Sequence, residues 1–80
     1  MKPILLRGHE RPINTVKINY DGDLIFTGSS DSKINIWSSQ NGERLGSVKC
    51  SAAVRSLDVS EDSNFFYAGL MTGIIEVYKL

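Results

Sequence analysis

Apolar and polar residues alternate along most of the chain, and short turn-forming segments interrupt the alternation at regular intervals. Val16, Ile18 and Tyr20 alternate with polar neighbours, which is the period of two that a half-buried β-strand shows. The segment from Leu24 to Ser29 has apolar residues on both faces, which indicates a strand between two neighbouring sheets. No segment carries the i, i+3, i+4 apolar stripe of a helix, so the pattern predicts an all-β fold.

The pattern occurs twice along the chain. Residues 13–18 align with residues 54–59, an offset of 54 − 13 = 41 positions. Without a gap, the later positions align as well: Phe26 with Tyr67, Gly28 with Gly69 and Trp37 with Tyr78. A period of roughly 40–45 residues is that of one four-stranded propeller blade. The repeat therefore predicts one complete blade of four strands at 13–48 and one blade of three strands, without its outer strand, at 54–79.

A short apolar run, residues 4–6, precedes the first unit and is predicted to form a separate outer strand. Two blades cannot close a ring, because propellers have roughly 4–8 blades. Residues 1–80 are therefore expected to form an incomplete propeller. Three outcomes stay open: the chain is a fragment or shortened form of a longer propeller, it exchanges outer strands between copies, or it folds only marginally.

The order of Gly8-His9, short strands and a terminal Trp37 resembles the WD-repeat family. In that family the strand before the Gly-His pair is the outer strand of the preceding blade, which implies the same for residues 4–6. The resemblance also places four residues in the hydrogen-bonded tetrad that stabilises a blade: His9, Ser29, Asp31 and Trp37. One histidine nitrogen would bind the aspartate, the other the serine, and the serine the indole N–H, so that each buried polar group is satisfied.

The second unit lacks this tetrad. Cys50 stands where His9 does in the first unit, and Leu70 and Thr72 replace the serine and the aspartate. Removing all partners of a polar network together leaves none of them unsatisfied, so the fold is compatible with the loss. The second blade is expected to depend on apolar contacts made by seven residues: Phe65, Phe66, Tyr67, Leu70, Ile75, Val77 and Tyr78.

Catalysis and cofactor binding are disfavoured by the motifs of the sequence. A hydrolase triad of Ser29, His9 and Asp31 lacks the Gly-x-Ser-x-Gly elbow and a helix that would stabilise an oxyanion. The single histidine and the single cysteine, Cys50, have no companions for a metal site. The glycines form no phosphate-binding or dinucleotide-binding motif. The sequence therefore predicts a protein that is not an enzyme and holds no metal or cofactor.

Charge and the N-terminal segment narrow the choice of partners and compartment. Nine basic and nine acidic residues give a formal net charge of zero, which disfavours direct binding to nucleic acid or to an anionic membrane. The first apolar run ends at Arg7 and is too short for a secretory signal or a membrane span. We therefore expect a cytoplasmic protein whose partners are other proteins.

Residues 1–46 resemble one WD-repeat family in particular, subunit i of eukaryotic translation initiation factor 3. The similarity is carried by Met1-Lys2-Pro3-Ile4-Leu5-Leu6, Gly8-His9-Glu10-Arg11, Gly22-Asp23-Leu24 and Asn41-Gly42-Glu43-Arg44-Leu45-Gly46. Residues 51–55 are similar to the start of a later blade, which implies that a blade is skipped. The resemblance implies a non-catalytic scaffold of a translation initiation complex, with other subunits as partners and no residue assigned to their contacts. The alternative is a WD-repeat scaffold of a receptor or signalling complex.

Overall fold

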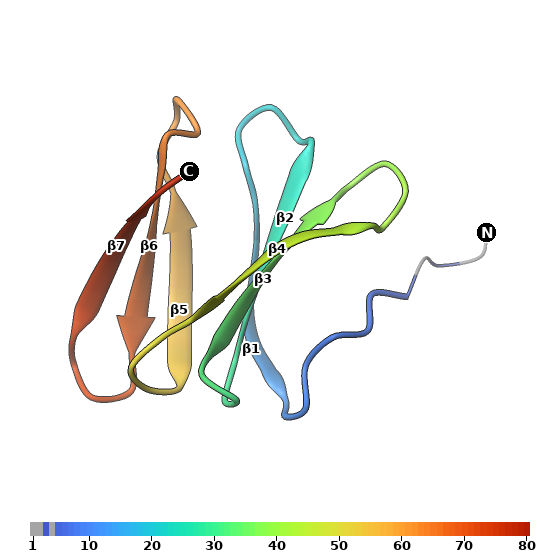
Figure 1. Ribbon diagram of the computed structural model, residues 1–80. Helices are drawn as coiled ribbons and strands as arrows, with labels where there is room; N and C mark the ends of the chain where they lie inside the picture. The colour runs from blue at the N-terminus through green and yellow to red at the C-terminus, as the bar shows by residue number, and fades with distance from the viewer. Residues whose placement is uncertain (1–2, 4) are drawn as a thin grey trace.

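The computed structural model describes Pro3 and residues 5–80 and consists of two antiparallel β-sheets that lie side by side (Figure 1). The first sheet contains β1 (Ile13–Ile18), β2 (Leu24–Ser29), β3 (Lys33–Ser38) and β4 (Arg44–Lys49), in that order. The second sheet contains β5 (Val54–Val59), β6 (Phe65–Leu70) and β7 (Ile75–Lys79). The described residues form no helix, and the predicted all-β fold of one four-stranded and one three-stranded unit is confirmed.

The two sheets repeat the same backbone features 41 positions apart, and residues so related are called equivalent below. Gly22 and Ser63 are equivalent, and both have a positive φ, of 76° and 59°. Ser32 and Gly73 form a second such pair, with φ of 70° and 86°. A β-bulge also recurs at equivalent positions of β1 and β5. Left-handed residues close tight turns between antiparallel strands, so both sheets are built from the same series of hairpins.

The core lies between the sheets, on the faces that they turn toward each other, here called the inner faces. The first sheet contributes Phe26 and Ile34, which are both fully buried. The second sheet contributes mainly Val54, Leu57, Phe66, Ala68 and Leu70. The Phe66 ring packs against two others, with centroid distances of 5.3 Å to Phe26 and 5.1 Å to Tyr78. Such aromatic pairs add about 0.5–1.5 kcal/mol each beyond the burial of area, so Phe66 joins the two sheets.

A close approach of the sheets requires a glycine at position 28. A Cβ atom on Gly28 would lie 2.5 Å from Val54 Cγ1 and 2.9 Å from Thr15 Cγ2. Val54 is fully buried, so it has little room to move aside. Asn14 adds a polar contact here, because its side-chain amide donates to the Val54 carbonyl at 2.8 Å. These contacts hold β5 against β1 and β2.

Each sheet also has an outer face, turned away from the other sheet. Side chains alternate along a strand, so Phe65 and Tyr67 lie on the outer face of the second sheet, with Ile75 and Val77 beside them on β7. Their exposed fractions are 37%, 37%, 70% and 59%. The prediction that these four side chains join the apolar core of the second unit is therefore wrong. The alternation turns their neighbours, including Phe66, toward the first sheet instead.

The predicted outer strand at residues 4–6 is not formed by the part of it that the structure describes. Ile4 lies outside the described residues, and Leu5 and Leu6 are not in a strand. An outer strand needs an edge to pair with, and the edge of the second sheet equivalent to the one that β4 occupies in the first sheet is that of β7. Figure 1 shows β7 on the far side of the molecule from the N-terminal segment. Exchange of this strand between copies stays a prediction.

Candidate functional site

The segment before β1 runs across the outer face of the first sheet and brings His9 to it. The carbonyl of Gly8 accepts a hydrogen bond from the buried Asn35 side chain at 3.1 Å. A Cβ atom on Gly8 would lie 2.9 Å from Cη2 of Trp37. A residue without a side chain is therefore needed for the segment to pass over the tryptophan. The side chain of the next residue, His9, lies against the outer face of the sheet and holds the segment there.

Four side chains form a continuous hydrogen-bonded network on this face. Trp37 Nε1 donates to Thr27 Oγ1 at 2.9 Å, and Thr27 Oγ1 lies 2.7 Å from Nε2 of His9. His9 Nδ1 lies 3.1 Å from Oδ2 of Asp31, and the side chains of these two residues are 2% and 6% exposed. An ionised carboxylate only accepts, so Nδ1 carries the hydrogen and Nε2 accepts from the Thr27 hydroxyl. Each polar group of the network then has a partner.

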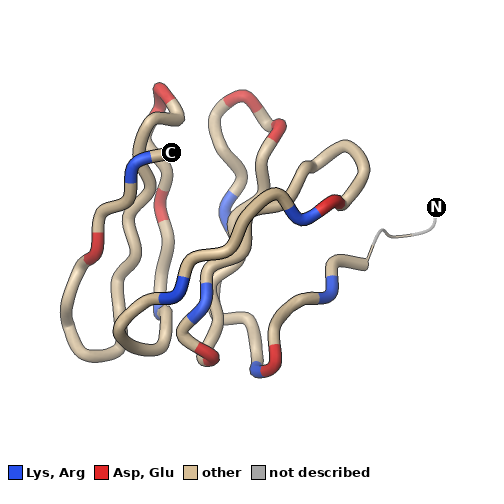
Figure 2. Tube along the Cα trace, in the orientation of Figure 1, with Lys and Arg blue, Asp and Glu red and all other residues tan. Residues whose placement is uncertain are grey.

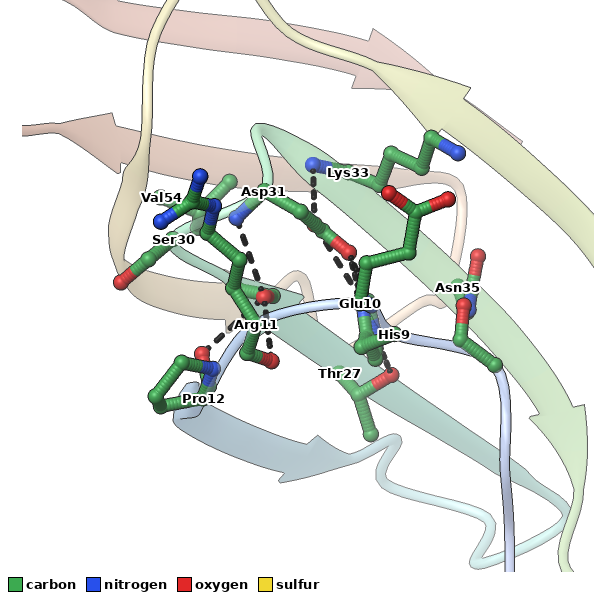
Figure 3. Close-up of polar contacts among 12 residues, drawn as sticks. His9, Glu10, Arg11, Pro12, Thr27, Ser30, Asp31, Lys33, Asn35 and Val54 are labelled. Atoms are coloured by element: carbon green, nitrogen blue, oxygen red, sulfur yellow. Dashed lines mark hydrogen bonds and ion pairs between the residues drawn. The ribbon is translucent and has the colours of Figure 1, made fainter.

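Asp31 also holds the backbone on both sides of the network. Its carboxylate accepts from the Lys33 N–H at 2.9 Å within the turn and from the Glu10 N–H at 3.1 Å (Figure 3). Burial acts to raise the pKa of Asp31, but the two backbone N–H groups and His9 act against it and leave this pKa below its ordinary value. Asp31 therefore ties the N-terminal segment to the β2–β3 turn in its charged form.

Ser29 does not take the place that the sequence analysis assigned to it, and Thr27 takes it instead. Ser29 Oγ lies 3.0 Å from the carbonyls of Arg11 and Pro12, to which it donates, and accepts from the Asp31 N–H at 3.1 Å. The prediction that Ser29 joins the histidine to the tryptophan is wrong. Its hydroxyl instead fixes the chain just before β1.

The strand register explains why threonine is the shared hydroxyl. Trp37 lies opposite Ile25, and Asn35 lies opposite Thr27. Thr27 is therefore the diagonal neighbour of Trp37 on the same face, within reach of a long side chain, whereas Ser29 is one pair farther along. The antiparallel pairing across the turn was the signal in the sequence that distinguishes the two hydroxyl residues.

The second sheet has a smaller polar cluster in the equivalent place, which the sequence analysis missed. The Tyr78 hydroxyl donates to Glu76 Oε1 at 2.7 Å and lies 3.6 Å from Cys50 Sγ, and Ser51 Oγ donates to the other Glu76 oxygen at 3.2 Å. Burial raises the pKa of the Tyr78 hydroxyl and that of the Cys50 thiol. The second unit thus combines apolar packing with a tyrosine–glutamate hydrogen bond, and does not depend on apolar contacts alone.

The network of the first sheet has the order hydroxyl, imidazole, carboxylate, which is also that of a hydrolase triad. Thr27 is only 4% exposed, however, and its oxygen already accepts from the tryptophan. No pocket opens in the part of the chain that the structure describes. Ser29 has no hydrogen bond to His9 among the described contacts, so the triad considered for Ser29, His9 and Asp31 is not assembled. The arrangement is suited to holding backbone segments together.

Two further features bear on ligands. No three His, Cys, Asp or Glu side chains gather as metal ligands among Pro3 and residues 5–80. Within the same residues, no helix is long and apolar enough to cross a membrane. Figure 2 shows basic and acidic residues interspersed along the described trace, many of them near turns. Exposed apolar side chains on the outer faces of the two sheets, among them Val16, Ile18, Ile75 and Val77, are candidates for contact with another protein.

Comparison with known proteins places this fold. A model of the family described as WD domain, G-beta repeat, matches residues 2–38. The solved structure of U3-55K superposes on 92% of this chain with a TM-score of 0.88 and 25% identity, and the crystal structure of the RRP9 WD40 repeats does so with the same values. The chain covers 25% and 24% of those two chains. It belongs to the WD-repeat family, and its two sheets are blades of an incomplete β-propeller.

Within that family the chain is similar to proteins named eukaryotic translation initiation factor 3 subunit I. It is 44% identical to the Schizosaccharomyces pombe protein over 81 positions, which include the whole of this chain. The Dictyostelium discoideum protein is 49% identical over 65 residues, or 81% of this chain, and the Xenopus tropicalis protein is 49% identical over 70 residues, or 86%. The chain spans 20% to 25% of the length of these relatives.

These alignments extend the similarity beyond residues 1–46. The alignment with the Schizosaccharomyces pombe protein takes up 81 positions for a chain of 80 residues, so both sheets lie within the aligned region. That a blade is skipped at residues 51–55 stays a prediction.

Proposed function

We propose that this chain acts as a non-catalytic protein–protein interaction scaffold in translation initiation, as a component of a cytoplasmic complex of the initiation factor 3 type. The observation that carries the proposal is the similarity of the whole chain to subunit I of that factor, at 44% identity. WD-repeat blades present rigid strands and turns to other proteins. Other subunits of the same factor are the proposed partners.

The geometry of the two sheets supports a scaffold. The side chains of His9 and Asp31 are engaged in holding the N-terminal segment on the first sheet, with contacts of 3.1 Å to each other and 2.7 Å from His9 to Thr27. The apolar side chains of the outer faces stay exposed, and such patches commonly mark sites of protein association. The exposed apolar side chains are therefore suited to association, whereas His9 and Asp31 serve as a structural anchor.

The proposal is tested by purifying the 80-residue chain with an affinity tag from a eukaryotic cell and identifying the proteins bound to it by mass spectrometry. We expect subunits of initiation factor 3 to be enriched over a tagged Phe66→Ala variant, in which the contact between the sheets is lost. Enrichment of receptor or kinase components without initiation-factor subunits would contradict the proposal. So would equal recovery of the subunits by the two chains.

A further inference from the structure

The outer face of the second sheet is equivalent to a face that is covered elsewhere in the same molecule. Tyr67 and Ile75 are equivalent to Phe26 and Ile34, which lie on the inner face of the first sheet and are fully buried beneath the second sheet. Tyr67 and Ile75 themselves are 37% and 70% exposed. The same face of the repeat is therefore covered by a neighbouring sheet in the first sheet and exposed in the second.

The outer face of the first sheet offers the other half of the same contact. Val16 and Ile18 are equivalent to Leu57 and Val59, which pack against the first sheet. In the first sheet, among Pro3 and residues 5–80, this side of the repeat is crossed by the segment before β1 but has no sheet against it, and Val16 and Ile18 are 55% and 59% exposed. The chain thus carries both partners of its internal interface a second time, at opposite ends of the pair of sheets (Figure 1).

A glycine and an aliphatic residue repeat the closest contact of that interface. Val54 seats on Gly28, with 2.5 Å between Val54 Cγ1 and the position of a glycine Cβ. The equivalent residues are Ile13, which is 45% exposed, and Gly69. A Cβ on Gly69 would have only atoms of Ser56 within 4 Å in the described chain. Gly69 thus leaves open the space that Val54 fills over Gly28, and this space is called the seat below. Ile13 is an aliphatic side chain of the kind that fills it.

The polar contact beside this seat has a counterpart too. Asn14, in the β-bulge of β1, donates to the Val54 carbonyl across the interface at 2.8 Å. The equivalent residue in the bulge of β5 is Arg55, which is exposed and is also a hydrogen-bond donor. Its acceptor in the repeated contact would be the Ile13 carbonyl. The apolar contact of Ile13 with Gly69 and the hydrogen bond from Arg55 are therefore compatible with the same docked arrangement of two copies.

We propose that a second copy of this chain docks the outer face of its first sheet onto the outer face of the second sheet, with Ile13 seated on Gly69. The contact is head to tail, so it leaves one seat and one free first sheet for further copies. Closure into a ring of roughly four to eight blades needs about two to four copies. This self-association does not depend on the proposed function in translation initiation.

The first test is the mass of the full chain in solution, measured by size-exclusion chromatography with light scattering across a dilution series. We expect a discrete closed oligomer that dissociates to monomer on dilution. The contact should be weaker than the internal one, because Thr27 and Ser29 stand at the positions where the second sheet has Ala68 and Leu70. A monomer at every concentration would overturn the proposal.

The second test uses two variants that each remove one half of the contact. Ile13→Asp places a charge on the side chain that enters the seat, and Ile75→Glu places one beside Gly69, its partner across β6 and β7. Either variant alone should be monomeric, because every contact needs both halves. An equimolar mixture should form a one-to-one dimer and nothing larger, since one variant keeps the seat and the other keeps the isoleucine.

Controls separate this outcome from a loss of folding. Met71→Glu puts the same charge on a side chain of similar exposure, 55%, in the β6–β7 turn, and should keep the wild-type oligomer. Circular dichroism of each variant reports the fold, and Ile18→Glu with Val77→Glu is a second pair if one of the first is unfolded. Retention of the oligomer by either folded single variant, or no dimer in the mixture of folded variants, would contradict the proposal.

Discussion

The two sheets follow one strand plan but secure the segment that crosses them by different chemistry. In the first sheet, His9 binds Asp31 and Thr27 in a network that links the segment to the turn and the tryptophan. In the second sheet, the equivalent segment carries Cys50, and Tyr78 stacks on Phe66 while its hydroxyl reaches Glu76. Both sheets thus share the same path of this segment, whereas the group of side chains that holds the segment differs completely between them.

This difference predicts where a single substitution is costly. A buried polar network loses stability when one member is removed, because the remaining donors and acceptors stay buried without partners. An apolar cluster loses stability in proportion to the volume removed. The following substitutions compare the two kinds of anchor, and each has a control substitution elsewhere in the chain.

The largest effect is expected from Phe66→Ala in the second sheet. Phe66 is 2% exposed and packs against aromatic rings of both sheets, so its removal should lower the free energy of unfolding by about 3–5 kcal/mol. Phe65→Ala, one residue away on the outer face, should cost much less. Urea unfolding followed by fluorescence measures both. Equal losses would show that the aromatic packing does not join the sheets.

The next effect concerns the glycines at equivalent positions of the two sheets. Gly28→Ala forces a Cβ against the buried Val54, and such overpacking costs about 1–3 kcal/mol. Gly69→Ala meets only the Ser56 hydroxyl, which rotates away, so the monomer should keep its stability. Thermal unfolding at high dilution compares the two. A larger loss for Gly69→Ala would contradict the assignment of the inner and outer faces.

Much of this fold was predictable from the sequence, because turns and alternation are local properties. The strand at Leu24–Ser29, for example, was expected at the bounds that the structure has. The choice between Ser29 and Thr27 was not made correctly, because it depends on which residues pair across the turn. The exposure of Ile75 and Val77 was also missed, since an apolar strand residue is buried only where another sheet covers it.

The polar network is broken most cleanly by Thr27→Val, which keeps the shape of the side chain and removes the shared hydroxyl. His9 Nε2 and the Trp37 N–H would then be buried without partners, at a cost of about 1–3 kcal/mol. Thr72→Val makes the same change at an exposed residue of the β6–β7 turn and should be nearly neutral. Chemical unfolding measures both variants. If Thr27→Val leaves the free energy of unfolding unchanged, the hydrogen-bonded network does not contribute to the stability of the first sheet.

The smallest effect is expected in the acid dependence of stability, which distinguishes the charged anchor of the first sheet. The folded-state pKa of Asp31 lies below the ordinary value of 3.8, so its contribution is complete above that value and is lost as the pH falls through the lower folded-state pKa. Unfolding free energies measured between about pH 5 and 3 should therefore decline, and Asp31→Asn should flatten this decline.

Asp62 supplies the control for this acid dependence, because its pKa is also lowered, mainly by the Ser60 hydroxyl, but it lies fully exposed in the β5–β6 turn. Solvent screens an exposed carboxylate, so Asp62→Asn should leave most of the decline in place. Equal flattening in the two variants would show that the acid sensitivity comes from turn carboxylates in general. A decline that persists in Asp31→Asn and disappears in Asp62→Asn would place the charged anchor in the second sheet.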